Sequence, residues 1–274
     1  MIDKAELNKE LKIPSTDTSQ DSLIQSIIWR AKEFFDSECN RDFWGLSRTE
    51  FYNGNGTDLL LVDQYPFSKD VAGLESNADI SVLKYWDSGE EEYTDLITET
   101  GDDIENSTEV LPCGELILLK GYTFLIGDKP KNIKITYEGG YRYKAGTGTL
   151  AITAGATAVV GTSTLFTTEC SVGDYLVIGS ERVKIKTITD ATHIVLEYGL
   201  ITAASTASYK ISNLPLDLVN GIIQKGLELY YDSPQGQSRF GISSSGVGSQ
   251  ASDSTSFNKV DFQPLINKYK RLTV

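Results

Sequence analysis

Carboxylates are the side chains of this sequence whose number and spacing could do chemistry. Ten of them lie between Asp87 and Glu109, in a stretch without lysine or arginine. Carboxylate oxygens can bind calcium, but the stretch lacks the regular ligand spacing and the glycine at the sixth position of a calcium-binding loop. The simplest interpretation of this stretch is a solvated loop. The alternative interpretation is an acidic surface that has a function. The candidate residues for such a surface are Glu90, Glu91, Glu92 and Asp95.

The remaining reactive side chains give no support for nucleophilic catalysis. The single histidine, His193, stands in a β-strand pattern beside aliphatic residues, and no partner is implied by its spacing. No Ser, Cys or Thr occupies the sharp strand-to-helix turn of a hydrolase nucleophile. The glycines at residues 54–56 and 146–148 lack the length and the lysine of a phosphate-binding loop. We therefore expect no enzyme activity and no cofactor, and a hydrolase of unfamiliar fold is a disfavoured alternative.

Charge and cysteine content narrow the class of protein further. A net charge of −13 argues against a general nucleic-acid binder held by phosphate neutralisation. Cys39, Cys113 and Cys170 lie far apart without paired spacing, which favours a reducing compartment and argues against a zinc site. The first residues carry no apolar signal region, and no apolar run approaches the length that crosses a membrane. We expect synthesis in the cytoplasm and no membrane partner.

Helical periodicity is strongest at residues 21–38, where apolar side chains recur every three or four positions. Thr18 and Asp21 have the spacing of a capping box and predict the start of this helix. A shorter helix is expected at residues 3–12, and Pro14 enforces its end.

A second long helix is predicted from Leu214 to Tyr231, with Asn213 as its N-terminal cap. Gly221 and Gly226 lie inside it, and each costs about 1 kcal/mol of helix stability relative to alanine. A close contact at these glycines, such as packing against the helix at residues 21–38, would compensate for that cost.

Strand patterns fill most of the sequence between the two long helices. The runs at residues 47–52 and 57–62 flank an Asn-Gly sequence, which predicts a β-hairpin because both residue types accept positive φ. Further strands are predicted at residues 80–86 and 115–120. Residues 131–141 alternate apolar and polar side chains, as expected of a strand with one buried face.

The composition changes at Ala145 to short runs of Thr, Ala, Gly and Val that continue to about Ile211. Several short predicted strands at this spacing favour a compact all-β module of barrel or sandwich type, with a bulge near Ile188. The predicted fold class is α+β: a core of helices and a β-hairpin with an inserted small all-β domain. The expected division assigns residues 1–144 and 212–274 to the core and residues 145–211 to the insertion.

The C-terminal part is predicted to form a mobile arm followed by a helix. Residues 233–260 hold nine serines and four glycines, a composition that cannot offset the entropy of ordering. The candidate contact residues of this arm are Arg239, Phe240 and Phe257. The helix predicted at residues 262–272 has Leu265, Ile266 and Tyr269 on one side and the cations Lys268, Lys270 and Arg271, with no acid nearby in the sequence.

Several short motifs follow one another in a set order in the parts that flank the insertion. They are Asp21-Ser22-Leu23-Ile24, Cys39-Asn40-Arg41-Asp42-Phe43, the run from Phe51 to Gly56, Tyr137-Glu138-Gly139-Gly140-Tyr141 and Leu214-Pro215-Leu216-Asp217-Leu218. This order resembles the head–tail connector (adaptor) proteins of tailed bacteriophages and prophages. The resemblance covers about residues 1–143 and 213–272. Family members commonly join the last two motifs by a short link, where this chain carries the inserted residues.

The resemblance implies a structural virion protein in the neck, at the head–tail interface. Such proteins form a ring beneath the portal, usually of about twelve copies, that extends the DNA channel. The implied partners are other copies of the chain, the portal protein, the next neck or tail protein, and DNA that passes without sequence-specific binding. The C-terminal helix would dock on the portal through Leu265, Ile266, Lys268, Tyr269, Lys270 and Arg271. The arm would order on assembly, and Glu90, Glu91, Glu92 and Asp95 would line the channel and repel phosphates.

The alternative function is a tail-associated receptor- or glycan-binding protein that uses residues 145–211. Aromatic platforms are expected in such a module, and it offers only Phe166, Tyr175, Tyr198 and Tyr209.

Overall fold

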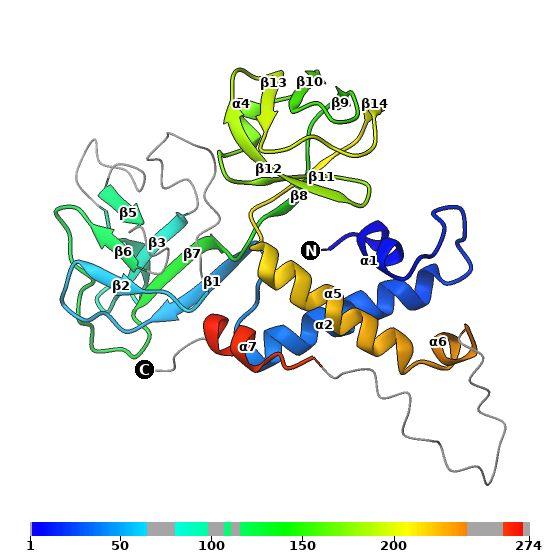
Figure 1. Cartoon of the computed structure of the whole chain (residues 1–274). Helices are drawn as coiled ribbons and strands as arrows, with labels where there is room; N and C mark the ends of the chain where they lie inside the picture. The colour runs from blue at the N-terminus through cyan, green and yellow to red at the C-terminus, as the bar shows by residue number, and fades with distance from the viewer. Residues whose placement is uncertain (1, 65–79, 98–106, 111–115, 240–259, 271–274) are drawn as a thin grey trace, which may run out of the picture. The chain divides into compact units, whose positions relative to one another are not determined.

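The computed structural model describes residues 2–64, 80–97, 107–110, 116–239 and 260–270 (Figure 1). It confirms a mixed α and β protein with large antiparallel sheets and a few helices. The chain divides into two units. In the described residues, the helical unit comprises 2–41, 177–182, 214–239 and 260–270, and the β unit comprises the rest. The predicted domain boundary at residue 144 falls inside the β unit.

Helices from both ends of the chain build the helical unit. They are α1 (Lys4–Glu10), α2 (Asp21–Cys39), α5 (Leu216–Tyr231), α6 (Pro234–Arg239) and α7 (Gln263–Tyr269). In Figure 1 α2 and α5 run side by side, and α1 and α7 pack against both of them. The apolar stripes predicted from the sequence form the core between these helices, with Ile27, Phe35 and Leu218 fully buried.

Both predicted helix caps are wrong, although the predicted helix spans are close to the observed ones. Gln20 caps α2 without a side-chain hydrogen bond. The capping box lies instead at α1, between Asp3 and Glu6. α5 begins after Pro215, because the Asn213 side chain accepts a hydrogen bond from the backbone N–H of Arg142 at 2.5 Å and is not available to cap a helix.

The predicted close contacts at the glycines of α5 are confirmed. A Cβ atom on Gly221 would lie 2.3 Å from Leu265 Cδ2 and 3.2 Å from the Phe35 ring of α2. A Cβ atom on Gly226 would lie 3.3 Å from the Leu7 methyl carbons and 3.7 Å from Ile27 Cγ2. The absence of a side chain at residue 221 therefore makes room for both α2 and α7.

Alanine at these two glycines should have opposite effects on stability. Gly226→Ala gains about 1 kcal/mol of helix propensity, and its Cβ requires only that the Leu7 methyl groups move by a few tenths of an ångström. Gly221→Ala gains the same amount but overpacks the contact with Leu265, at a cost of about 2 kcal/mol. The expected net loss is about 1 kcal/mol for Gly221→Ala, measured by urea denaturation. Equal stabilisation by both substitutions would contradict the packing described above.

Two small sheets share one hydrophobic core in the β unit. The four-stranded sheet has the order β1 (Leu46–Tyr52), β7 (Ile133–Gly139), β3 (Ile80–Asp87) and β4 (Glu92–Asp95). The three-stranded sheet has the order β2 (Leu59–Leu61), β6 (Leu116–Leu119) and β5 (Thr108–Val110). The alternation predicted at residues 131–141 is confirmed, because Ile133, Ile135 and Tyr137 are fully buried between the sheets.

The predicted hairpin at residues 47–62 is wrong. β1 pairs with β7 over its whole length, and β2 pairs with β6. The Asn-Gly segment between β1 and β2 is held by a distant loop: Asn53 accepts a hydrogen bond from Lys131 N, and Gly54 N donates to Asn132 Oδ1. A Cβ on Gly54 would lie 1.7 Å from the Leu125 carbonyl oxygen, so this glycine serves a close backbone approach.

The third sheet confirms the short strands predicted in the insertion. Its order is β14 (Ala204–Ala207), β9 (Thr149–Ile152), β10 (Ala158–Thr162), β13 (His193–Leu196), β12 (Glu181–Ile188), β11 (Tyr175–Ile178), β15 (Lys210–Ser212) and β8 (Tyr143–Ala145). A short helix, α4 (Phe166–Glu169), follows β10. The register of β12 against β13 shifts between Ile185 and Thr187, close to the predicted bulge. β8 pairs with β15, so the two ends of the insertion are hydrogen-bonded neighbours.

Candidate functional site

The acidic residues singled out in the sequence lie on the β3–β4 hairpin. Glu90, Glu91 and Glu92 are exposed at its turn, where Glu91 has a positive φ of 55°. Asp95 is also exposed, but its Oδ1 lies 3.3 Å from Lys84 Nζ on the neighbouring strand. Of the four residues singled out, three thus present their carboxylates to solvent and the fourth is joined to a lysine.

Beside this turn, three aromatic rings and two lysines form a cluster that the sequence did not predict. The Tyr93 ring centroid lies 5.2 Å from that of Trp86 and 5.6 Å from that of Phe51. Lys129 Nζ lies 3.2 Å from the Trp86 ring centroid, and Lys134 Nζ lies 5.8 Å from that of Tyr93. We call this set the aromatic–lysine face. It lies on the outer side of the four-stranded sheet, since Phe51 pairs with Lys134, whose neighbours Ile133 and Ile135 face the core.

The C-terminal helix α7 packs its apolar side into the helical unit. Ile266 and Tyr269 are 4% and 8% exposed, and Leu265 is half-buried, whereas Lys268 and Lys270 are exposed. No acid lies near these cations in the sequence, but Lys268 forms an ion pair with Asp217 at the start of α5. Arg271 lies outside the described residues.

Asp217 links α7 to α5 and makes this contact dependent on pH. Partial burial raises the pKa of Asp217, but hydrogen bonds from Lys268, Tyr269 and Leu218 N outweigh it, so the net pKa is lowered. A carboxyl group whose pKa is lower in the folded state stabilises that state above its unfolded pKa, and this contribution is lost as pH falls. We expect the melting temperature to fall less between neutral and acidic pH in Asp217→Asn than in the wild type. An equal fall in both proteins would count against this link.

The predicted mobile arm at residues 233–260 needs one correction. Its first part is α6, which ends at Arg239, and Ser233 Oγ accepts a hydrogen bond from Gly236 N at 3.1 Å. The Pro-Gln-Gly sequence forms a short helix because Pro234 suits a first helical position. Phe240 and Phe257 lie outside the described residues.

Several buried polar groups have structural partners. Tyr137 donates a hydrogen bond to Glu50 at 2.6 Å, and Tyr52 donates to the same carboxylate oxygen. Burial raises the pKa of both phenols, and Glu50 raises it further. Arg142 and Asp174 form an ion pair at 3.1 Å with both side chains 6% exposed. Burial raises the pKa of Asp174 in spite of Arg142. These groups hold strands and loops together; Tyr137, Arg142 and Asp174 are buried, and Glu50 and Tyr52 are half-buried.

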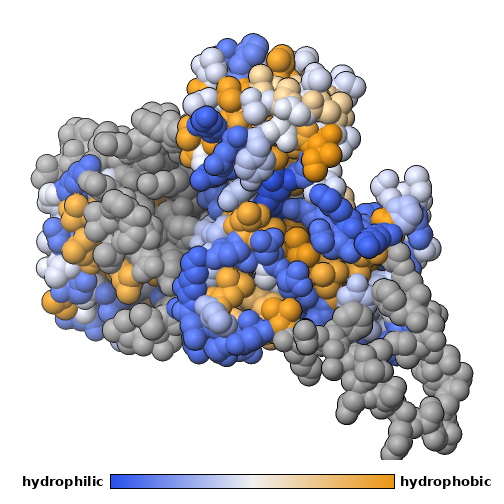
Figure 2. Space-filling view, in the orientation of Figure 1, coloured by the Kyte–Doolittle hydropathy of each residue, from blue (hydrophilic) through white to orange (hydrophobic). Residues whose placement is uncertain are grey.

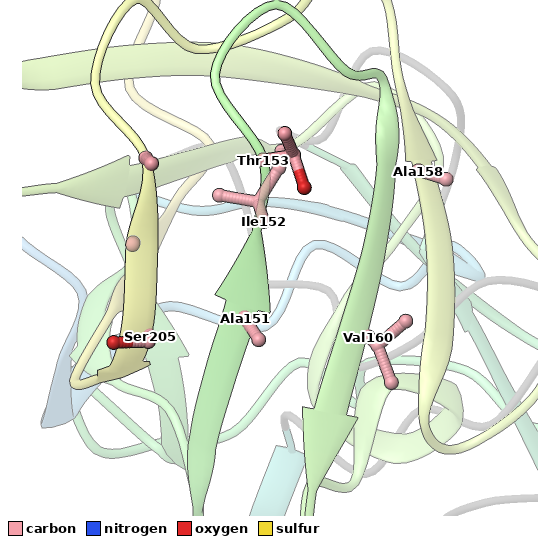
Figure 3. Close-up of a pocket in the computed structure, with 8 residues that line it drawn as sticks. Ala151, Ile152, Thr153, Ala158, Val160 and Ser205 are labelled. Atoms are coloured by element: carbon pink, nitrogen blue, oxygen red, sulfur yellow. The ribbon is translucent and has the colours of Figure 1, made fainter.

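A shallow groove lies on the third sheet, over β14, β9 and β10. It has a volume of about 480 Å³ and is lined by small aliphatic and hydroxyl residues. Figure 3 shows Ala151, Val160 and Ser205 on three neighbouring strands of its floor. Figure 2 shows a surface of mainly weakly polar and hydrophobic residues over β9 and β14. None of the lining residues is aromatic, so the groove lacks the stacking platform expected of a glycan site.

Catalytic or metal chemistry has no further candidate in the described part of the chain. No group of three His, Cys, Asp or Glu side chains there could hold a metal ion. His193 is exposed and lies 3.0 Å from Asp190, in the turn before β13. None of the described helices combines the length and the apolar character needed to cross a membrane. No family model matches the chain, and no curated protein or solved structure shows significant similarity to it.

Proposed function

We propose that this chain is a structural subunit of the head–tail connector of a tailed bacteriophage. In this proposal about twelve copies form a closed ring beneath the portal, extend the DNA channel and join the capsid to the next neck or tail protein. The portal-docking element is α7, and the one assembly-arm candidate that the structure describes is Arg239, at the end of α6.

The arrangement of the helical unit supports this proposal best. α1 and α2 come from the first 41 residues, α5 and α7 come from the last 61, and they pack as one body. The resemblance predicts one body built from residues 1–143 and 213–272, and the helical unit joins the first 41 residues of the first flank to the second flank. The burial of Ile266 and Tyr269 narrows the docking surface on α7 to the exposed lysines and the half-buried Leu265.

The exposed carboxylates of the β3–β4 turn fit a channel wall. Among the described residues no lysine or arginine is paired with Glu90, Glu91 or Glu92, and their negative charge repels DNA phosphates. In the ring this turn faces the lumen, so DNA slides past without adhering.

Electron microscopy of the purified protein mixed with the portal protein of the same genome tests the proposal. We expect a ring that caps the portal, with the same cyclic symmetry. The protein alone gives the control image. A protein that never joins the portal, or that labels the tail tip of assembled particles, would overturn the proposal and favour the receptor-binding alternative.

A further inference from the structure

The aromatic–lysine face combines two features that single-stranded nucleic acids need. Phe51 is 42% exposed at the edge of the sheet, and the Tyr93 and Trp86 rings continue from it across β4 and β3. Aromatic side chains on an open sheet surface provide π-faces on which unpaired bases stack. Phe51, Tyr93 and Trp86 form such a surface, because each ring contacts the next.

The lysines of the face supply the matching positive charge. Among the described residues, the carboxylate of Asp95 is joined to Lys84, and no carboxylate is joined to Lys129, Lys131 or Lys134. Lys131 follows Lys129 by two residues, and its carbonyl oxygen accepts a hydrogen bond from the Tyr93 hydroxyl at 2.9 Å, which places its backbone beside the face. Three lysines without a carboxylate partner, two of them over the rings of the face, stand out in a chain with a net charge of −13. Their charge is complementary to a phosphate chain.

We propose that the aromatic–lysine face binds a single-stranded nucleic acid, with bases on Phe51 and Tyr93 and phosphates on Lys129, Lys131 and Lys134. The acidic turn at Glu90–Glu92 bounds the face on one side. It repels the second phosphate chain of a duplex, whereas a single strand fits between the rings and the lysines. An acidic peptide would match the charge but would leave the row of rings unexplained. This site is independent of the connector proposal.

Fluorescence polarisation with the full chain tests the site. The probes are a fluorescein-labelled oligothymidylate, the corresponding duplex and labelled polyglutamate. Three phosphate contacts predict a slope of about −2 for log K against log salt with the single strand. We expect the single strand to bind at low salt and the other two probes to bind at least tenfold more weakly.

Two substitutions assign the binding to this face. Phe51→Ser removes a stacking ring and should weaken binding by roughly 5- to 150-fold. Lys134→Gln should weaken it less and should reduce the salt slope by roughly 0.7. Trp29→Ser is the matched control, because Trp29 is also an exposed ring, 49% exposed, near a lysine at 5.9 Å, but lies on α2. Circular dichroism establishes that each variant is folded.

The outcomes separate the possible ligands. Preferential binding of the oligothymidylate that both substitutions weaken and Trp29→Ser leaves unchanged supports the site. Absence of binding at low salt, equal binding of the duplex or polyglutamate, or loss of binding in Trp29→Ser alone would overturn it. If Phe51→Ser does not fold, an unchanged salt slope in Lys134→Gln is enough to reject the site.

Discussion

Replacing Arg182 by alanine should lower the free energy of unfolding by about 3 to 5 kcal/mol, the usual cost of removing one partner of a buried ion pair. Arg182 Nε lies 3.0 Å from Glu6 Oε1 and Nη2 lies 3.3 Å from Oε2, and both side chains are 5% exposed. Glu6 also accepts a hydrogen bond from Asp3 N that closes the start of α1. Without the guanidinium, the carboxylate stays buried without its charge partner, and α1 loses its anchor. Urea denaturation followed by far-ultraviolet circular dichroism measures the loss.

Two further variants separate charge from packing. Lys4→Ala removes the ion pair with Asp21, whose side chains are 38% and 35% exposed, and should cost less than about 1 kcal/mol. The double variant Glu6→Leu with Arg182→Leu removes both buried charges and should recover much of the stability lost in Arg182→Ala. If Arg182→Ala costs no more than Lys4→Ala, the pair does not anchor α1.

Local patterns predicted the elements whose stability is local or periodic. The sequence predicted the apolar stripe of α2, the alternation along β7 and the close contact at Gly221, because each follows from the spacing of residues within one segment. The caps failed for the opposite reason. Asn213 has a side chain suited to a cap, but it stands two residues before the N-cap position and is bonded to Arg142, a residue 71 positions away.

Strand pairing and the formation of the aromatic–lysine face depend on which strands are neighbours and on their register. No single segment of the sequence specifies either of these. The Asn-Gly signal after β1 is a sound local hairpin signal, yet β1 gains a partner over its full length in β7. Phe51, Trp86 and Lys129 are separated by more than thirty residues each, and only the order β1-β7-β3-β4 brings them together. One signal in the sequence pointed to this face. The alternation at residues 131–141 places Lys134 on the side of the strand opposite to the buried Ile133 and Ile135.

Reversing the charges of the acidic turn should slow DNA ejection by at least roughly tenfold. This is the lower end of the rate effects that concentrated surface charge produces. Glu90, Glu91 and Glu92 are the residues to change to lysine, and Asp95 is left in place because it is joined to Lys84. Each reversal adds two charges, so the net charge rises by six, from −13 to −7. In the proposed ring these lysines would meet DNA phosphates within a Debye length of about 8 Å and hold the duplex. Dye fluorescence of released DNA gives the ejection rate of particles that carry the variant.

A second triple variant matches the change in net charge at another place. Glu10, Glu33 and Glu38 are exposed residues of the helical unit, and their replacement by lysine also gives −7. Slower ejection in the turn variant alone places the turn at the channel, because a general effect of charge would slow both. Where the variants do not assemble, the salt dependence of duplex binding by the purified proteins gives the same comparison. Equal ejection rates in the wild type and the turn variant would remove the carboxylates of the β3–β4 hairpin from the channel wall.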